Sequence, residues 1–428
     1  MNLLDTNKNN SPPDKPWAAF HFRDYRILWT SSVTAMLTMN LRIIATGIWL
    51  YEETGAGSTL AWLGLVEFIM RIPANLYGGA LADEVDRKKI MVASQFASFA
   101  LIGIMAVLLS MDSLMIWHVF VVTAFLSATS VMSNPSRSAL TANIVPKSYL
   151  VHAVATNTIT MQVGTIAMPL VFWITSLTAT LTLTFAIASL CGLVSTIVPL
   201  FIHTPGMAKN VSRGSSRVKN IIAGLKYVKS HPILPGLYLL DICVTVVSFY
   251  RQLFPIFADQ LYKGGRGTVS ILTAANSFGG VMGSALVMFT SQFKAKGMLV
   301  LYATLVYSIL LIAFGAIQSL WIGSLIIVAL GATDSIGMTT RQTVVQLTTP
   351  DNMRGRAVSA HSLAAMTANG IGQAEVGFMS DVIGASNTML LGGAISLIAT
   401  LLIWWLIKGI RLYRYEATLE NDHTNFEI

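Results

Sequence analysis

Charged residues are scarce in this sequence. Asp, Glu, Lys and Arg together make up only 11% of its 428 residues, whereas a soluble domain averages about 25%. Hydrophobic residues make up 54%, and the mean hydropathy is +0.63. This balance excludes an ordinary soluble protein and predicts an integral membrane protein.

Several chemical signatures are missing as well. The two cysteines, Cys191 and Cys243, both fall in apolar stretches, so we expect neither a disulfide framework nor a metal site. A Gly-x-x-x-x-Gly-Lys-Ser/Thr phosphate loop does not occur, which argues against ATP-driven transport, and we expect no cofactor. Residues 1–26 lack the apolar core of a secretory signal, so the first apolar segment is expected to anchor the chain.

Long apolar segments recur at intervals that predict twelve membrane-spanning helices of about 20 residues each. They lie at roughly 27–50, 59–82, 90–110, 115–133, 151–175 and 179–202, and then at 233–257, 268–290, 298–317, 320–340, 357–379 and 387–407. We therefore predict an all-α membrane protein built from two six-helix bundles. The expected domains are a tail at 1–26, a bundle at 27–202, a linker at 203–232, a bundle at 233–407 and a tail at 408–428.

Lysine and arginine are concentrated on one side of the predicted membrane. Most of the 28 Lys and Arg residues fall in connections on the side that holds both termini, Arg137 and Arg341 among them. Only Lys263 and Arg266 fall in connections on the other side. The positive-inside rule therefore predicts that both termini lie in the cytoplasm. Because this topology explains the net charge of +8, we expect no nucleic-acid partner.

The central connection contains an amphipathic pattern. Five apolar residues share one helical face and four cations flank it: Val218, Ile221, Ile222, Leu225 and Val228, with Arg217, Lys219, Lys226 and Lys229. The pattern is typical of a helix that lies in the membrane interface. A calmodulin-like target sequence has a similar pattern, and we favour a linker helix between the bundles.

A weak internal repeat relates the two predicted bundles. At an offset of 204 residues, Arg137, Pro146 and Ala153 recur as Arg341, Pro350 and Ala357, and Gly79 recurs as Gly283. Two related halves around a central site are the architecture expected of a secondary transporter.

The connection after the second span combines small residues, a carboxylate and three cations. From Gly78 to Lys89 it reads Gly-Gly-Ala-Leu-Ala-Asp-Glu-Val-Asp-Arg-Lys-Lys. Asp83 can accept hydrogen bonds from the exposed N–H groups of a neighbouring helix, and Arg87 can pair with carboxylates or lipid phosphates. We expect these two residues to form a latch between helices. Lys88 and the cation after it are expected to hold the connection at the membrane surface.

This run resembles the signature Gly-x-Leu-Ala-Asp-Arg-x-Gly-Arg-Lys of the major facilitator superfamily, through Gly79, Leu81, Ala82, Asp83, Arg87 and Lys88. Asp86 stands where that pattern has Gly, which is similar to the branch of enterobactin exporters and multidrug efflux proteins. The segments 134–140 and 350–356 are similar to that branch too. The resemblance implies a monomeric transporter of the bacterial cytoplasmic membrane with two pseudo-symmetric bundles. It also implies that Gly79, Asp83, Arg87 and Lys88 gate one access state, and that the first, fourth, seventh and tenth helices line the cavity.

Ionisable residues also occur inside the predicted spans, where each costs roughly 2.5–3.5 kcal/mol to insert. They are Arg42 in the first span, Glu67 and Arg71 in the second, Asp241 and Arg251 in the seventh, Asp334 in the tenth and Glu375 in the eleventh. Such groups normally face the protein interior or a water-filled path. Together with the resemblance, this makes Arg42, Asp241 and Asp334 candidates for lining the cavity or coupling protons.

The spacing of these residues predicts their partners. Glu67 and Arg71 lie at i and i+4, which favours an ion pair with a structural or a transport role. Asp241 has no cation at i±3 or i±4, so it must find a partner on another helix or bind a proton. Asp334 is expected near the cytoplasmic end of its span. Glu375 is expected toward the outer end of its span, between the bundles, where a gating role fits.

These observations favour a secondary transporter that exports small organic molecules, siderophore-like or drug-like, by proton-coupled alternating access. Its expected partners are the transported molecule, protons and membrane lipids. The alternative is an uptake carrier or a lysolipid flippase of the same fold. A receptor or an intramembrane enzyme is more remote, because neither a signalling domain nor a nucleophile–base pair is apparent.

Overall fold

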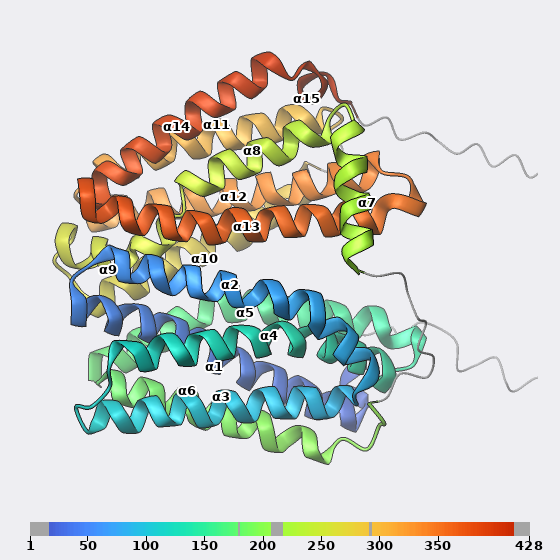
Figure 1. Ribbon diagram of the computed structural model, residues 1–428, viewed down its shortest axis with the longest axis vertical. Helices are drawn as coiled ribbons and strands as arrows, with labels where there is room; N and C mark the ends of the chain where they lie inside the picture. The colour runs from blue at the N-terminus through green and yellow to red at the C-terminus, as the bar shows by residue number, and fades with distance from the viewer. Residues whose placement is uncertain (1–16, 179, 207–216, 291–292, 415–428) are drawn as a thin grey trace, which may run out of the picture.

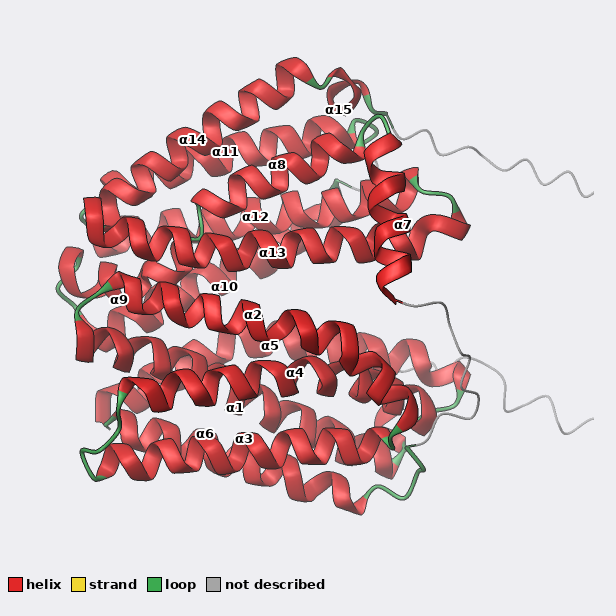
Figure 2. Cartoon of the chain, in the orientation of Figure 1, coloured by secondary structure: helices red, strands yellow, loops and turns green. Residues whose placement is uncertain are grey.

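The computed structural model describes residues 17–178, 180–206, 217–290 and 293–414; within these ranges, the side chains of 75–84, 147, 176–178, 217–221 and 351–352 are outside the description. In this part of the chain every regular element is a helix (Figure 2). A bilayer offers no water to backbone N–H and C=O groups, and helices satisfy these groups internally. The predicted all-α class is confirmed.

The helices run in chain order through two halves. The N-terminal half contains η1 (Ala18–His21), α1 (Arg23–Thr54), α2 (Gly57–Glu84), α3 (Arg87–Ser110), α4 (Ile116–Ile144), α5 (Lys147–Thr178), α6 (Leu181–Ile197) and η2 (Val198–Phe201). After α7 (Arg217–Ser230), the C-terminal half contains α8 (Leu234–Val247), η3 (Tyr250–Leu253), α9 (Phe254–Ile256), η4 (Phe257–Leu261), α10 (Gly265–Phe289), α11 (Lys296–Ala316), α12 (Leu320–Thr348), α13 (Asp351–Ile383), α14 (Ala385–Leu406) and α15 (Lys408–Leu412).

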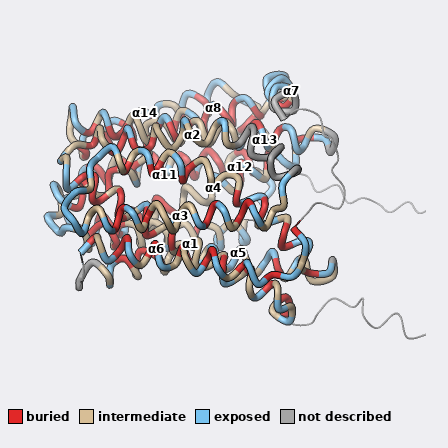
Figure 3. Tube along the Cα trace, turned by 60° about the horizontal axis from the view of Figure 1, so that its bottom comes forward, coloured by how far each residue is buried: buried red, intermediate tan, exposed pale blue. Residues whose placement is uncertain are grey.

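The two halves form two bundles that lie side by side (Figure 1). The long helices of both bundles run in roughly the same direction, and α7 lies across them on the C-terminal bundle. The first and last described residues lie at the same end of the molecule, which we call the terminal end; we call the opposite end the far end. Figure 3 shows buried and exposed positions interleaved along the long helices, as expected where one face packs in the bundle and another meets lipid.

Ten helical segments of the described chain are long and apolar enough to cross a membrane. The predicted count of twelve therefore stays a prediction. The helices α2 and α13, at the second and eleventh predicted spans, are not among the ten. Both carry ionisable residues, Glu67 and Arg71 in α2 and Glu375 in α13, and they pack against each other between the bundles. A helix that packs on protein rather than lipid needs less hydropathy.

Small residues allow two helices of the C-terminal bundle to approach closely. A Cβ atom added at Gly283 of α10 would collide with the backbone of Ala332 in α12, and one added at Gly331 would collide with the backbone carbonyl of Asn276. Packing of this kind drives helix association in membranes, where no hydrophobic driving force operates between helices.

Two predicted connections are in fact helical. The helix α4 continues to Ile144 and α12 continues to Thr348, so Arg137 and Arg341 lie within helices. The assignment of these two cations to the connections was wrong. Arg341 is buried inside the protein, where a carboxylate on another helix balances its charge.

The seventh predicted span, over 233–257, is interrupted before Pro255. The helix α8 ends at Val247, and Tyr250 begins a short 3₁₀ turn. At the interruption, the Tyr307 hydroxyl donates to the Ser248 carbonyl oxygen over 3.1 Å. Broken helices of this kind occur in membranes where they line a cavity, because the freed backbone groups need polar partners.

Candidate transport site

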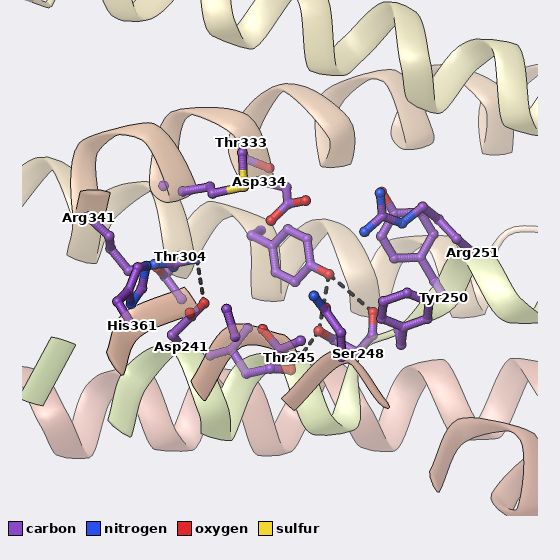
Figure 4. A pocket seen from close by; sticks show the side chains of 17 residues that line it. Asp241, Thr245, Ser248, Tyr250, Arg251, Thr304, Thr333, Asp334, Arg341 and His361 are labelled. Atoms are coloured by element: carbon purple, nitrogen blue, oxygen red, sulfur yellow. Dashed lines mark hydrogen bonds and ion pairs between the residues drawn. The ribbon is translucent and has the colours of Figure 1, made fainter. Parts of the chain in front are cut away.

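A polar cavity of about 130 Å³ lies within the C-terminal bundle, beside the broken span (Figure 4). Its walls come from α8, η3, α11, α12 and α13. The polar lining residues are Asp241, Thr245, Ser248, Tyr250, Arg251, Thr304, Tyr307, Thr333, Asp334, Arg341, His361 and Asn369. Asp241 and Asp334, two of the three residues predicted to line a cavity or couple protons, are among the residues of this lining, and their roles stay predictions.

Asp241 has a partner on another helix. Its Oδ1 atom lies 2.5 Å from an Nη2 atom of Arg341 in α12, and the two residues are only 6% and 8% exposed. His361 of α13 lies beside this pair (Figure 4). The Arg341 Nε and His361 Nδ1 atoms are buried and have no hydrogen-bond partner in the described part of the chain. A buried donor or acceptor without a partner is unfavourable, so both atoms are places where a water molecule or a transported molecule can bind.

Asp334 lies between the ion pair and Arg251 along the cavity (Figure 4). It is near the middle of α12, because that helix continues to Thr348; the expectation that it lies near one end was wrong. Among the described residues Asp334 forms no ion pair, and its carboxylate points into the cavity. Arg251 is exposed to the cavity, and its guanidinium lies 5.2 Å from the centre of the Phe249 ring.

The N-terminal bundle carries a second charge cluster. Arg71 Nη2 lies 2.9 Å from Glu67 Oε2, and Arg42 Nη2 lies 3.7 Å from Glu67 Oε1. Glu67 and Arg71 line a cavity of about 260 Å³ between α2 and α13. Arg42 is 4% exposed and lines neither of these two cavities.

The two cavities adjoin along α13. Ala365 and Asn369 line both of them, so this helix brings the charge clusters of the two bundles to the same region. Glu375, six residues after Asn369 in α13, lines neither cavity, and its Oε2 atom is buried without a hydrogen-bond partner in the described part of the chain.

The predicted gating motif is described in part. The side chains of Gly79 and Asp83 lie outside the described residues, although both positions belong to α2. Lys88 Nζ donates to the carbonyl oxygens of Leu200 and Ile202 over 3.0 and 2.8 Å. These bonds tie the start of α3 to the end of the sixth span, within the N-terminal half. At Arg87, the backbone N–H donates to the Gly206 carbonyl oxygen over 3.4 Å.

A cluster of contacts joins the two bundles at the far end. Arg266 of α10 donates two hydrogen bonds to the Glu52 carboxylate of α1, over 2.6 and 2.7 Å. The Asp381 carboxylate, near the end of α13, accepts hydrogen bonds from the backbone N–H groups of Gly57 and Ser58 over 2.6 and 2.8 Å. We call these five residues the far-end clamp. Sequence reasoning missed it; the available signal was Arg266, a rare cation on the side opposite the termini.

The sequence profile of the transmembrane secretion effector family matches residues 14–425. The chain belongs to this family of major facilitator transporters. It is 26% identical over 356 residues to the enterobactin exporter EntS of Escherichia coli O81 (strain ED1a), with 79% of this chain and 81% of that protein aligned. The enterobactin exporter of Shigella boydii serotype 18 is equally similar, at 26% identity over the same shares. The predicted superfamily is confirmed, and these relatives are transporters rather than enzymes.

Solved structures show the same fold. The chain superposes on the nucleoside transporter NupG with a TM-score of 0.72 at 12% identity, over 89% of this chain and 99% of that one. For a bacterial homologue of the human lysosomal transporter Spinster, crystallised in an inward-facing conformation, the TM-score is 0.68 at 13% identity, over 92% and 99% of the two chains. At these identities the similarity establishes the fold alone.

Proposed function

We propose that this protein is a proton-coupled exporter of small organic molecules, acting as a monomer in the cytoplasmic membrane of a bacterium. The similarity to enterobactin exporters supports export. The concentration of Lys and Arg in connections at the terminal end supports an orientation with both termini in the cytoplasm. The far end then faces the outside of the cell.

The polar cavity of the C-terminal bundle is the observation that carries this proposal. It holds Asp241, Asp334 and two arginines at membrane depth, where charged side chains are rare unless they serve a pathway. The far-end clamp closes the interface between the bundles on the outer side. This combination supports an inward-facing state, in which the cargo enters from the cytoplasm.

Asp334 is the acid we assign to proton coupling. Protonation of Asp241 would break a buried ion pair with Arg341, and one buried charge would be left without a partner. Asp334 forms no such pair among the described residues, so it can gain or lose a proton without that penalty. When ionised, it can be attracted to Arg251 across the cavity.

We assign the charge cluster of the N-terminal bundle to the same transport site as the polar cavity of the C-terminal bundle. Among the described residues, the Glu67 carboxylate contacts two guanidiniums, so two cations share one carboxylate beside the second cavity. We assign Arg71, which reaches that cavity, to cargo contact and Arg42 to holding Glu67 in place. Glu375, a half-buried residue whose Oε2 atom is buried, is assigned to the gate.

The proposed gate includes two acidic residues at corresponding positions in the sequences of α13 and α2. Asp381 lies two residues before the end of α13 and caps the start of α2. Asp83 lies one residue before the end of α2, which runs toward the end of the molecule where α13 begins. We propose that Asp381 stabilises the inward-facing state and that Asp83, with Arg87 and Lys88, stabilises the outward-facing state.

Transport in proteoliposomes tests the export proposal. Enterobactin, cationic dyes and lysolipids are screened with and without an imposed pH gradient. We expect at least one compound to move against its gradient when protons flow the opposite way. Asp334→Asn should abolish this uphill transport while leaving downhill exchange of the same compound, because the cavity remains but the proton site is lost.

Asp112→Asn, the same change at an exposed loop residue, is the matched control and should transport normally. If Asp334→Asn still couples transport to the pH gradient, our assignment of the proton site is wrong. If no compound responds to the gradient in the unmodified protein, proton-coupled export is wrong.

Cysteine accessibility tests the gate. In a chain with Cys191 and Cys243 replaced by alanine, Asn369→Cys places a thiol where the two cavities meet. Asp381→Ala should raise the labelling of this thiol by a membrane-impermeant maleimide, added at the far end, roughly fivefold. The capping carboxylate contributes about 1 kcal/mol to the closed state of the far end, and its loss should make opening that much easier. Unchanged labelling, matching an Asp112→Ala control, would contradict a role for the clamp.

A further inference from the structure

The linker helix α7 has two faces with different surroundings. Its inner face packs on the C-terminal bundle: Val228 is 6% exposed, and Gly224 lies against the backbone of Arg356 and the side chain of Ala360 in α13. The Tyr227 hydroxyl donates to the Thr348 carbonyl oxygen of α12 over 3.4 Å. The helix is therefore fixed to one bundle.

The outer face of α7 has no partner among the described residues. It presents Ile222 and Leu225, which the sequence pattern grouped with the buried Val228, together with Lys226 and Lys229, and these four residues follow the i, i+3, i+4, i+7 spacing of a single helical face. Ile222 is 59% exposed and Leu225 is 46% exposed, and both lysines are exposed. Arg356, also exposed, lies on the neighbouring turn of α13. The face thus combines two apolar side chains with a rim of cations.

The position of α7 places this face at the membrane surface. Gly224 contacts α13 five to nine residues after that helix begins, or roughly 8–14 Å along its axis. At 33 residues, α13 is about 50 Å long, and a hydrocarbon core of about 30 Å leaves about 10 Å of it in the headgroup region at each end. Figure 1 shows α7 lying across the bundle helices, so its axis follows the membrane plane.

We propose that the outer face of α7, with Arg356, binds anionic phospholipids of the cytoplasmic leaflet. Ile222 and Leu225 enter the upper acyl region, while the lysine side chains extend to the lipid phosphates. Charge complementarity selects this occupant, because the face carries cations and no carboxylate among its described residues. The lipid would hold the C-terminal bundle at a fixed depth through α7. This inference concerns lipid contact and does not depend on the identity of the cargo.

A fluorescent probe on the outer face tests the proposal. Leu225→Cys, in the chain with Cys191 and Cys243 replaced by alanine, is labelled with an environment-sensitive fluorophore and titrated with phosphatidylglycerol in neutral detergent micelles. We expect the emission to shift to shorter wavelength and saturate, as the probe leaves water. The same titration with phosphatidylcholine should give a smaller shift that does not saturate.

Lys226→Gln and Lys229→Gln should each raise the half-saturating amount of phosphatidylglycerol roughly fivefold. The matched control removes two other exposed lysines at the terminal end, Lys89→Gln with Lys294→Gln, and should leave the midpoint unchanged. The proposal is wrong if the probe stays in water at every lipid composition, as it would if a soluble protein were the partner. It is also wrong if the control shifts the midpoint as far as the test variants do.

Discussion

The two bundles handle their membrane-embedded charges differently. In the C-terminal bundle, Asp241 and Arg341 form a one-to-one pair at 2.5 Å, and both are less than a tenth exposed. In the N-terminal bundle, the Glu67 carboxylate is shared between Arg71 at 2.9 Å and Arg42 at 3.7 Å. The side chain of Arg71 is 30% exposed.

The two clusters differ in how many cations each carboxylate serves. The Asp241–Arg341 pair is electrically neutral, so either partner alone would be a buried charge in a medium of low polarity. Among the described residues, the N-terminal cluster has two guanidiniums beside one carboxylate, and Arg71 lines a cavity in which its guanidinium can interact with water or cargo. Substitutions should therefore affect stability most in the C-terminal bundle.

Breaking the buried pair should have the largest effect. We expect Asp241→Asn to lower the free energy of unfolding by about 3–5 kcal/mol, because Arg341 is left charged and buried without a carboxylate. Titration of the purified protein with sodium dodecyl sulfate in mixed micelles measures this quantity. Adding Arg341→Met should recover much of the loss, since the unpaired charge is then removed.

Asp334→Asn provides the matched control for this measurement. It makes the same chemical change in the same cavity, at a carboxylate without an ion pair among the described residues. We expect it to change the free energy of unfolding by less than about 1 kcal/mol. Equal losses in Asp241→Asn and Asp334→Asn would show that the buried pair does not stabilise the bundle.

The contrast between the two clusters also explains which contacts the sequence could predict. The spacing of Glu67 and Arg71 is local, since i and i+4 share a helical face in any α-helix, and their side chains lie 2.9 Å apart in the structure. Arg341 stands 100 positions after Asp241, and only the packing of α8, α12 and α13 brings the two together. A hydropathy pattern predicts that a helix ends where polar residues begin. Polar residues begin near position 339, so the pattern predicts a connection at Arg341, whereas α12 continues to Thr348.

The fold class could be predicted from the sequence, whereas the helix interruption and the far-end clamp could not. The order of the apolar segments was sufficient for the fold class, because a bilayer permits few alternatives to helices. The interruption at Ser248 contains no proline or glycine from which it could have been predicted. Pro255 lies more than a helical turn further along the chain. In the far-end clamp, Asp381 accepts hydrogen bonds from backbone N–H groups. Every helix start has such groups whatever its residues, so the sequence does not show which helix start Asp381 contacts.

Removing the shared carboxylate should have a smaller effect than breaking the buried pair. We expect Glu67→Gln to lower the free energy of unfolding by about 2 kcal/mol, because it leaves Arg42 buried without a counter-charge while Arg71 keeps access to the cavity. The same detergent titration measures it.

Two double variants then distinguish the effects of Arg42 and Arg71 on the free energy of unfolding. Adding Arg42→Gln to Glu67→Gln should restore most of the lost stability, because the Arg42 side chain is only 5% exposed and its charge cannot reach water. Adding Arg71→Gln should restore little, because that side chain is 30% exposed and its charge is already solvated in part. Equal recovery by the two double variants would mean that the arginines are equivalent, and the assignment of Arg71 to the cargo side would lose its structural basis. A difference in recovery would instead show that the N-terminal bundle confines one positive charge and presents the other to the cavity.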